Sequence, residues 1–216
     1  MNTSKIAQSS VRDAVHVLDS EPLCIEFLLD ETGSMSSCRN ATVGGFNDYL
    51  NEQKSVTGEC LLTLTKFEGG NLVTPYQDLD IGLVPEMTDR MFVPKGGTNL
   101  FDAIGDRIMK MRERMSSWDN SPKVLFVVMT DGGDNASYRY DSSSIKELVT
   151  ELEATERWTF VYLGANQNAL QVGAKMGFSE GNIRSFETAQ MRETMNDLSR
   201  ATTVYRASGD ATKNFF

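Results

Sequence analysis

The chain has 216 residues, which is enough for one domain with a sizeable hydrophobic core. Apolar residues make up 40% of it and charged residues 24%, as in water-soluble globular proteins. The net charge of −9 argues against direct binding to nucleic acid, which normally requires a basic face.

The sequence shows no membrane-targeting pattern. The apolar run Val124–Met129 is far too short to cross a bilayer, and residues 1–10 lack the apolar stretch of a secretory signal. The three cysteines, at positions 24, 38 and 60, are odd in number and show no C-x-x-C spacing, which favours free thiols in a reducing compartment. We therefore expect a cytoplasmic protein without a membrane partner.

Apolar segments alternate with amphipathic ones along the chain, a pattern that predicts a parallel sheet with helices on both faces. The expected strands are Leu23–Leu29, Leu61–Phe67, Leu72–Tyr76, Val124–Met129 and Trp158–Leu163. Apolar residues at helical spacing predict helices near 40–54, 100–116, 145–152 and 191–201. Ser144 and Glu147 are the expected capping box of the third helix.

One connection predicts a different strand pairing. The turn Glu68-Gly-Gly-Asn71 joins two strands as a hairpin, and Pro75 suits an edge strand. The predicted fold is therefore a doubly wound α/β domain whose sheet has about six strands, mostly parallel, with one antiparallel edge strand. We expect this domain at residues 21–208, with an N-terminal arm at 1–20 and a C-terminal tail at 209–216.

The first expected strand ends in a D-x-T-x-S run formed by Asp30, Thr32 and Ser34. A carboxylate and two hydroxyls are hard oxygen donors, which suit Mg²⁺, Mn²⁺ or Ca²⁺ better than zinc or copper. Taken alone, the run could equally be a strand-to-helix loop with capping residues. Three donors also cannot fill an octahedral shell, so further ligands must come from elsewhere in the chain.

Two later segments supply further oxygen donors. Thr98 lies in a glycine-rich loop before an expected helix, and Asp131 follows the most apolar strand. With these residues the chain resembles a von Willebrand factor type A (VWA) domain, in which D-x-[ST]-x-S, a distant Thr and a distant Asp form a metal-ion-dependent adhesion site. The resemblance runs from about Leu23 to about Arg206. The resemblance is strongest to compact intracellular VWA proteins of bacteria and phages, which share the sequence segments at residues 96–104 and 162–167.

The resemblance implies how the site would work. Ser34 and Thr98 would bind the cation directly, Thr32 indirectly, and Asp131 directly or through water. In the doubly wound topology the strands that end at Asp30 and Asp131 are neighbours at the switch point, where ligands bind. Mg²⁺ is the expected ion, with Mn²⁺ or Ca²⁺ as alternatives. A carboxylate from a partner protein would complete its shell, so the resemblance implies metal-dependent protein binding.

The neighbours of these residues are less informative. Glu31 and Asp134 are interpreted as solvated loop charges rather than ligands. Whether Asn99 and Asn135 orient water at the site is left open.

A Mg²⁺-dependent phosphotransfer enzyme is the strongest enzymatic alternative, because phosphatases also hold Mg²⁺ in acidic loops at strand ends. Those enzymes usually carry a second aspartate two residues after the first, where this chain has Thr32. The chain has no G-x-x-x-x-G-K-[ST] phosphate-binding loop. Its single histidine, His16, falls in the expected arm, which argues against a Ser-His-Asp triad. We therefore expect no enzymatic activity.

A structural role is the other alternative. The aromatic pair in Asn214-Phe-Phe216 would be adhesive if exposed, so the tail can be expected to fold back, to dock into a neighbouring copy, or to stay disordered. Docking would make the chain a self-assembling accessory protein of a phage or bacterium.

Overall fold

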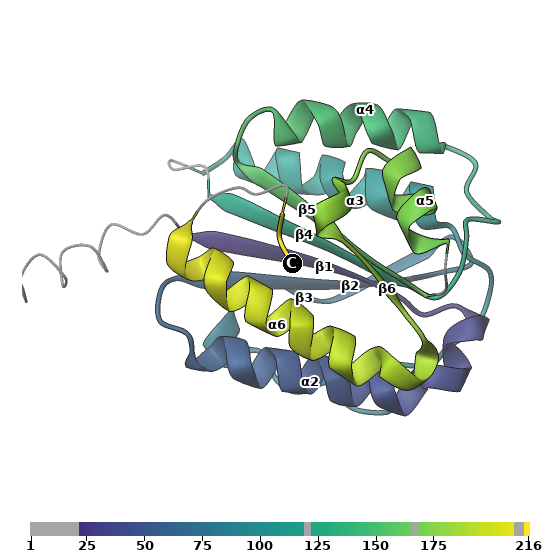
Figure 1. Cartoon of the computed structure of the whole chain (residues 1–216), viewed down its shortest axis with the longest axis horizontal. Helices are drawn as coiled ribbons and strands as arrows, with labels where there is room; N and C mark the ends of the chain where they lie inside the picture. The colour runs from purple at the N-terminus through teal and green to yellow at the C-terminus, as the bar shows by residue number, and fades with distance from the viewer. Residues whose placement is uncertain (1–21, 119–121, 166–167, 210–213) are drawn as a thin grey trace, which may run out of the picture.

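The computed structural model describes residues 22–118, 122–165, 168–209 and 214–216. Within them, six strands form one sheet in the order β3-β2-β1-β4-β5-β6 (Figure 1). The strands are β1 (Leu23–Asp30), β2 (Cys60–Glu68), β3 (Asn71–Asp80), β4 (Lys123–Thr130), β5 (Trp158–Ala165) and β6 (Ile183–Phe186). All neighbouring pairs are parallel except β2 with β3. The predicted doubly wound fold with one antiparallel edge strand is confirmed.

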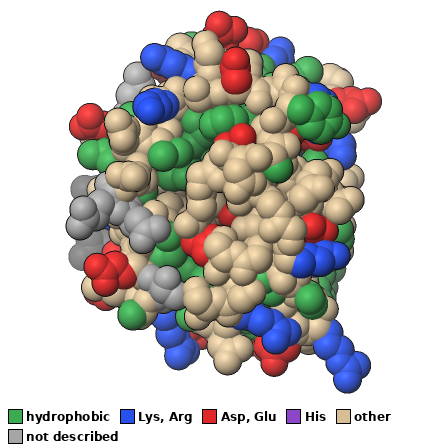
Figure 2. Space-filling view, turned by 90° about the vertical axis from the view of Figure 1, so that its right-hand side faces the viewer, with side chains coloured by type: hydrophobic (Ala, Val, Ile, Leu, Met, Phe, Trp, Pro, Cys, Tyr) green, Lys and Arg blue, Asp and Glu red, His purple; other side chains and the backbone are tan. Residues whose placement is uncertain are grey.

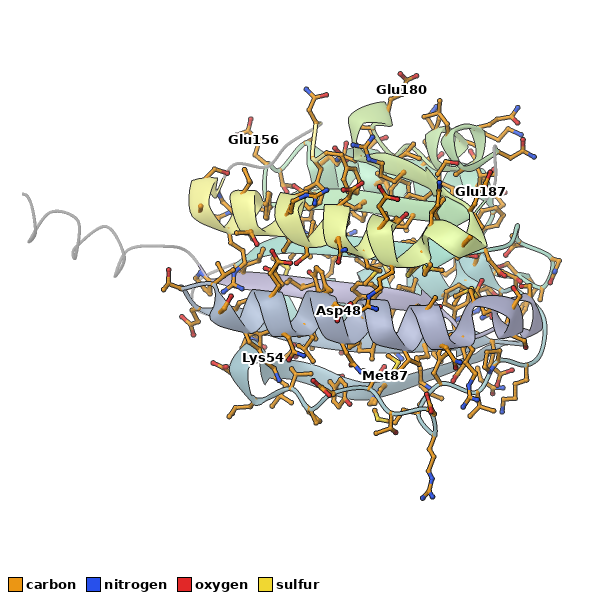
Figure 3. All side chains as sticks on the ribbon, turned by 60° about the horizontal axis from the view of Figure 1, so that its bottom comes forward. Asp48, Lys54, Met87, Glu156, Glu180 and Glu187 are labelled. Carbon is orange, nitrogen blue, oxygen red and sulfur yellow. The ribbon has the colours of Figure 1, made fainter. Side chains whose placement is uncertain are left out.

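Helices cover both faces of the sheet (Figure 1). On one face lie α2 (Arg39–Ser55) and α6 (Met191–Ser208), which pack side by side in Figure 3. The other face is covered by α3 (Leu100–Met115), α4 (Ser142–Glu153) and α5 (Ala169–Lys175). Short 3-10 helices occupy Gly33–Cys38, Ile81–Leu83, Glu180–Asn182 and Thr188–Gln190.

The strand pattern explains why two separate cores form. Along β1, Ile25, Phe27 and Leu29 join the core under α2 and α6. Cys24 and Leu28 point to the opposite core, under α3, α4 and α5. Alternate residues of a strand face opposite sides, so a central strand covered on both faces is expected to be mostly apolar on both. All eight residues of β1 are accordingly buried.

The predicted hairpin is present between β2 and β3. Gly69 and Gly70 form its turn with φ of +49° and +89°, a backbone region in which side chains other than glycine are strained. Pro75 lies on β3, the edge strand, as expected.

Three features differ from the prediction. The helix α4 begins at Ser142, so its capping box is formed by Asp141 and Ser144 rather than by Ser144 and Glu147. The Asp141 carboxylate accepts the Ser144 N–H at 2.8 Å, and the Ser144 hydroxyl accepts the Asp141 N–H at 2.9 Å. Neither α5 nor β6 was predicted, because both are short and β6 carries exposed residues at its two central positions.

Residues 214–216 pack against the domain. Phe215 is buried against the Tyr205 ring on α6, and its backbone N–H donates to Asn182 Oδ1 at 2.9 Å. The Phe216 N–H donates to the Gly181 carbonyl, and the Arg184 guanidinium lies over the Phe216 ring. The two aromatic residues thus fold back onto their own chain, while the expected N-terminal arm lies outside the described residues.

The described part of the chain contains no helix long and apolar enough to span a membrane. Its three cysteines are buried and free, as expected.

A buried ion pair ties the sheet to α3. Glu26, in the middle of β1, accepts a hydrogen bond from Arg107 Nη2 at 2.8 Å and contacts Arg114. Arg107 is 2% exposed, so its charge depends on Glu26 for compensation. Such a pair adds little to stability over an apolar pair, but breaking it leaves a buried charge unpaired.

We predict that Glu26→Leu lowers the free energy of unfolding by about 3–5 kcal/mol, because Arg107 loses its partner. The double variant Glu26→Leu/Arg107→Met should recover most of this loss. Urea unfolding followed by circular dichroism measures both. A double variant as unstable as the single one would show that the damage comes from packing rather than from the charge.

Candidate metal centre

The candidate site lies at the carboxyl ends of two adjacent strands. β1 and β4 pair in parallel, with Leu29 opposite Met129, so Asp30 and Thr130 end the two strands at the same edge. Asp131 follows directly. Figure 2 looks onto this end of the molecule, where backbone and uncharged polar groups fill most of the centre and a few acidic atoms lie recessed among them. This is the predicted switch point between the two halves of the sheet.

The five predicted site residues form one chain of hydrogen bonds. Asp30 Oδ1 accepts the Thr32 N–H at 2.7 Å, and the Thr32 hydroxyl lies 3.1 Å from that of Ser34. Ser34 Oγ donates to Asp131 Oδ1 at 2.6 Å, and Thr98 Oγ1 donates to Thr32 Oγ1 at 3.4 Å. We call these residues the oxygen cluster. Side chains that are distant in sequence are therefore brought into direct contact.

Backbone contacts hold the three loops of the cluster together. The Gly33 N–H donates to the Gly96 carbonyl at 3.2 Å, which joins the Asp30 loop to the Thr98 loop. Asn135 Oδ1 accepts the Thr98 N–H at 2.8 Å, while the N–H groups of Asn135 and Ala136 donate to the Thr98 carbonyl at 2.9 and 3.0 Å. Gly96 has φ +70°, and a Cβ there would lie 3.3 Å from the Gly69 backbone nitrogen. Both the left-handed backbone and the close approach of Gly69 favour glycine at this position.

The loop after β4 is fixed from α3. Asp102, which is buried, accepts the backbone N–H groups of Tyr138, Arg139 and Tyr140 at 2.9 to 3.1 Å. Burial raises the pKa of Asp102, but these N–H groups and the Arg139 charge outweigh it, so the pKa lies below its usual value. The Asp102 carboxylate therefore stays ionised and holds the loop that carries Asp131.

Both carboxylates of the oxygen cluster are in a position that disfavours negative charge. Burial raises the pKa of Asp30, against hydrogen bonds from Thr130 and Thr32 that lower it, and the charge of Asp131 raises it further. Burial also raises the pKa of Asp131, against the hydrogen bond from Ser34. A divalent cation between them would relieve this cost, because it compensates both charges.

The donor set fits a hard divalent cation. Two carboxylates and three hydroxyls offer only oxygen. Among the described residues no group of three or more His, Cys, Asp or Glu side chains could hold a metal, so hydroxyls are essential to this site. Beside Thr98, the buried Asn99 Oδ1 has no hydrogen-bond partner within the described structure, and a cation-bound water is a suitable donor for it.

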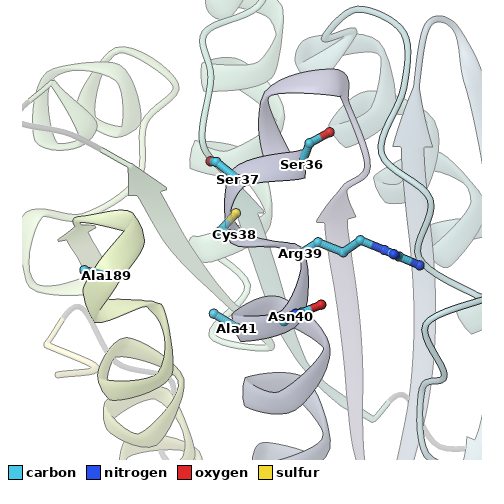
Figure 4. Close-up of a pocket in the computed structure, with 7 residues that line it drawn as sticks. All are labelled: Ser36, Ser37, Cys38, Arg39, Asn40, Ala41 and Ala189. Carbon is cyan, nitrogen blue, oxygen red and sulfur yellow. The ribbon is translucent and has the colours of Figure 1, made fainter.

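An open groove adjoins the oxygen cluster. It has a volume of about 680 Å³ and is lined by Ser36, Ser37, Cys38, Arg39, Asn40, Ala41 and Ala189 (Figure 4). Ser37 Oγ donates to the Ser34 carbonyl at 3.3 Å, so the groove begins next to a cluster residue.

No protein-family model matches the chain, and no curated protein is similar to it in sequence. Solved structures do match. Proximal thread matrix protein 1 from the mussel byssus shares 13% identity at a TM-score of 0.62, over 87% of this chain and 48% of that one. The ArnB paralog VWA2 from Sulfolobus acidocaldarius shares 14% identity at a TM-score of 0.58, over 83% of this chain and 45% of that one. The chain has the fold of a von Willebrand factor type A domain.

A third match has a similar extent in both chains. Manganese-loaded TRAP protein from Plasmodium vivax shares 15% identity at a TM-score of 0.55, over 81% of this chain and 72% of that one. By contrast, this chain spans about half the length of the mussel and Sulfolobus chains. The mussel protein has also been solved with a zinc-occupied MIDAS motif, the metal-ion-dependent adhesion site of VWA domains.

Sequence analysis misinterpreted Glu31 and missed Thr130, both of which adjoin the oxygen cluster. Glu31 is not a solvated charge but is 5% exposed and paired with Lys66. Asp134 is half-buried and accepts hydrogen bonds from the Phe101 N–H and the Ser137 hydroxyl. Thr130, which donates to Asp30 Oδ2 at 2.5 Å, was missed, although its position directly before Asp131 was a signal. Asn135, whose role the sequence left open, binds the backbone N–H and carbonyl of Thr98.

We predict that Mg²⁺, Mn²⁺ or Ca²⁺ at about a hundred times its dissociation constant adds about 2.7 kcal/mol to the free energy of unfolding. In a domain of this size this raises the melting temperature by roughly 5–10 °C over the value in EDTA. Ser34→Ala and Thr98→Val should abolish most of the rise, because each removes one hydroxyl donor. Ser36→Ala, which removes an exposed hydroxyl from the same 3-10 helix, should keep it. Equal rises in all four proteins would place the cation elsewhere.

Proposed function

We propose that this VWA domain is a protein-binding module in which a divalent cation, held by Asp30, Thr32, Ser34, Thr98 and Asp131, captures a carboxylate of a partner protein. The observation that carries the proposal is the oxygen cluster itself. Three separate loops contribute to it, and hydrogen bonds already join its five residues, Asp30 through the Thr32 backbone N–H and the others through their side chains.

The exposure of the cluster residues indicates that a partner's carboxylate could reach the cation site from one side. Asp30, Thr32 and Thr98 are buried, whereas Ser34 is exposed and Asp131 is half-buried. A ligand would therefore approach past Ser34 and Asp131. The groove over Ser36–Ala41 begins in the 3-10 helix that carries Ser34 and offers room for the residues that flank the partner's carboxylate.

A bound cation would supply an electrophilic centre with room for an outside ligand, because five side chains that each gave one oxygen would leave a position of an octahedral shell open. We propose Mg²⁺ as the ion, with Mn²⁺ and Ca²⁺ as alternatives, from the all-oxygen donor set. Structures of similar fold with zinc in the MIDAS motif or loaded with manganese support a divalent cation in general.

Binding is favoured over catalysis by the environment of the possible nucleophiles. Asp30 is 0% exposed, and hydrogen bonds from Thr32 and Thr130 occupy both of its oxygens. An aspartate that attacks a phosphate must be accessible. The Cys38 thiol is also buried, and burial raises its pKa above the usual value, which disfavours the reactive thiolate.

We predict that the immobilised protein retains partner proteins from a cell extract in Mg²⁺ and releases them in EDTA. Ser34→Ala should retain at least about tenfold less, because the cation loses a ligand at the accessible side. Ser36→Ala serves as the matched control and should behave as the wild type. Partners held equally well in EDTA would contradict a cation-mediated contact.

We also predict that the protein does not hydrolyse p-nitrophenyl phosphate in Mg²⁺ above the rate in buffer. Hydrolysis by the wild type that disappears in Asp30→Ala would replace the binding proposal with a phosphotransfer enzyme.

A further inference from the structure

The oxygen cluster depends on a long loop that has little structure of its own. Residues 84–99 connect the 3-10 helix Ile81–Leu83 to α3 and deliver Thr98 to the cluster. Loops of this length in a compact domain are usually functional and must be fixed by outside contacts.

Helix α2 holds the first part of this loop. Asn47 bonds the backbone N–H and carbonyl of Met87 at 2.7 and 2.9 Å, and Met87 is labelled beside α2 in Figure 3. Arg39 Nε donates to the Phe92 carbonyl at 2.9 Å. These contacts end at Phe92, so the backbone around Met91 and Val93 and the stretch that continues to Thr98 need further attachment from another side.

A buried ion pair meets the loop at that stretch. Lys66 Nζ, from β2, lies 2.7 and 2.8 Å from the two carboxylate oxygens of Glu31. Glu31 Oε1 also accepts the Val93 N–H at 2.6 Å, and Lys66 Nζ donates to the Met91 carbonyl. Each charged group thus binds its partner and one backbone group of the loop. The carboxylate serves as an acceptor for an N–H, and the ammonium group serves as a donor to a carbonyl.

The ion pair lies next to the oxygen cluster on both sides. Glu31 directly follows Asp30, and its backbone carbonyl accepts the Lys95 N–H at 2.9 Å. From there the loop continues to Gly96, whose carbonyl binds the Gly33 N–H, and then to Thr98.

Burial makes the pair an expensive means of stabilisation. Glu31 is 5% and Lys66 8% exposed, so both charges have lost most of their hydration. Apolar residues of similar size would usually serve stability as well or better. The pair is therefore better explained by position, because Glu31 holds a backbone N–H of the loop and Lys66 holds a backbone carbonyl, which apolar residues could not do.

We infer that Glu31 and Lys66 are positioning residues that clamp the loop of Thr98 onto the loop of Asp30 and so set the geometry of the cation site. Neither residue is a ligand. The inference rests on the proposed function where it concerns the cation, but the clamp itself exists without one.

The clamp is tested first without metal. Glu31→Met/Lys66→Met replaces the pair with apolar side chains, so the fold should be retained while the loop loses its attachment. In EDTA, amide hydrogen exchange should become at least about tenfold faster at Val93 and Lys95. Met87, held by Asn47, is an internal control and should exchange at the wild-type rate. Unchanged exchange at Val93 and Lys95 would overturn the clamp.

The effect on the site is tested by titration with Mn²⁺ and Mg²⁺ in a calorimeter. The double variant should bind at least about tenfold more weakly than the wild type, as expected when a group that orients ligands is removed. Glu26→Leu/Arg107→Met is the matched control, because it removes a buried ion pair four residues before Asp30 and should leave the affinity unchanged.

The possible outcomes separate the two proposals. A wild type that binds Mn²⁺ and a double variant that binds it equally well would overturn the positioning role and leave the proposed function standing. A wild type that binds neither ion would overturn the proposed function and the cation part of this inference, while hydrogen exchange would still decide whether the clamp exists.

Discussion

The parallel pairing of β1 with β4 is the constraint on which the candidate site depends. The two strands run in register from Leu23 with Lys123 to Leu29 with Met129, so their last residues must end at one edge. The Thr130 hydroxyl then reaches across to Asp30 Oδ2. The separation of the two carboxylates is therefore set by β1 and β4, which are buried on both faces and closely packed, and so resist deformation.

The site combines this rigid base with loops that need outside support. Asp30 and Asp131 follow strands directly, whereas Thr98 arrives on a loop that begins at Val84. The backbone of Thr98 is fixed by Asn135 on one side, and its approach is fixed by Gly96 and the Glu31–Lys66 pair on the other. The affinity of the site for a cation would therefore also depend on contacts made by residues that are not ligands.

Much of the fold could be predicted from the sequence because burial leaves a periodic signal. β4 and β5 are nearly continuous apolar runs, and both were predicted. The turn of the β2–β3 hairpin was identified from two glycines, which the positive φ values require. β6 has no such pattern, since only its first and last residues are buried. Short edge elements are specified mainly by their neighbours rather than by their own residues.

For the oxygen cluster, the cluster residues themselves could be predicted from the sequence, but the residues that support them could not. Its five members could be named because they resemble a known pattern, and the structure brings them together. Glu31 was misread because its partner, Lys66, lies on another strand, and no local spacing reveals that pairing. Supporting residues of this kind depend on tertiary contacts, which a single sequence does not display.

Two buried ion pairs show what such supporting residues do in this domain. Glu26 and Glu31 lie in or directly after β1, and each binds a basic residue from another element. Arg107 joins the sheet to α3, the helix that Thr98 precedes, and Lys66 joins β2 to the loop before Thr98. Neither pair is needed to bury apolar surface. Only the Glu31–Lys66 pair contacts the loop that carries Thr98, so the distance from Thr98 to Asp30 should depend on that pair and not on Glu26 and Arg107.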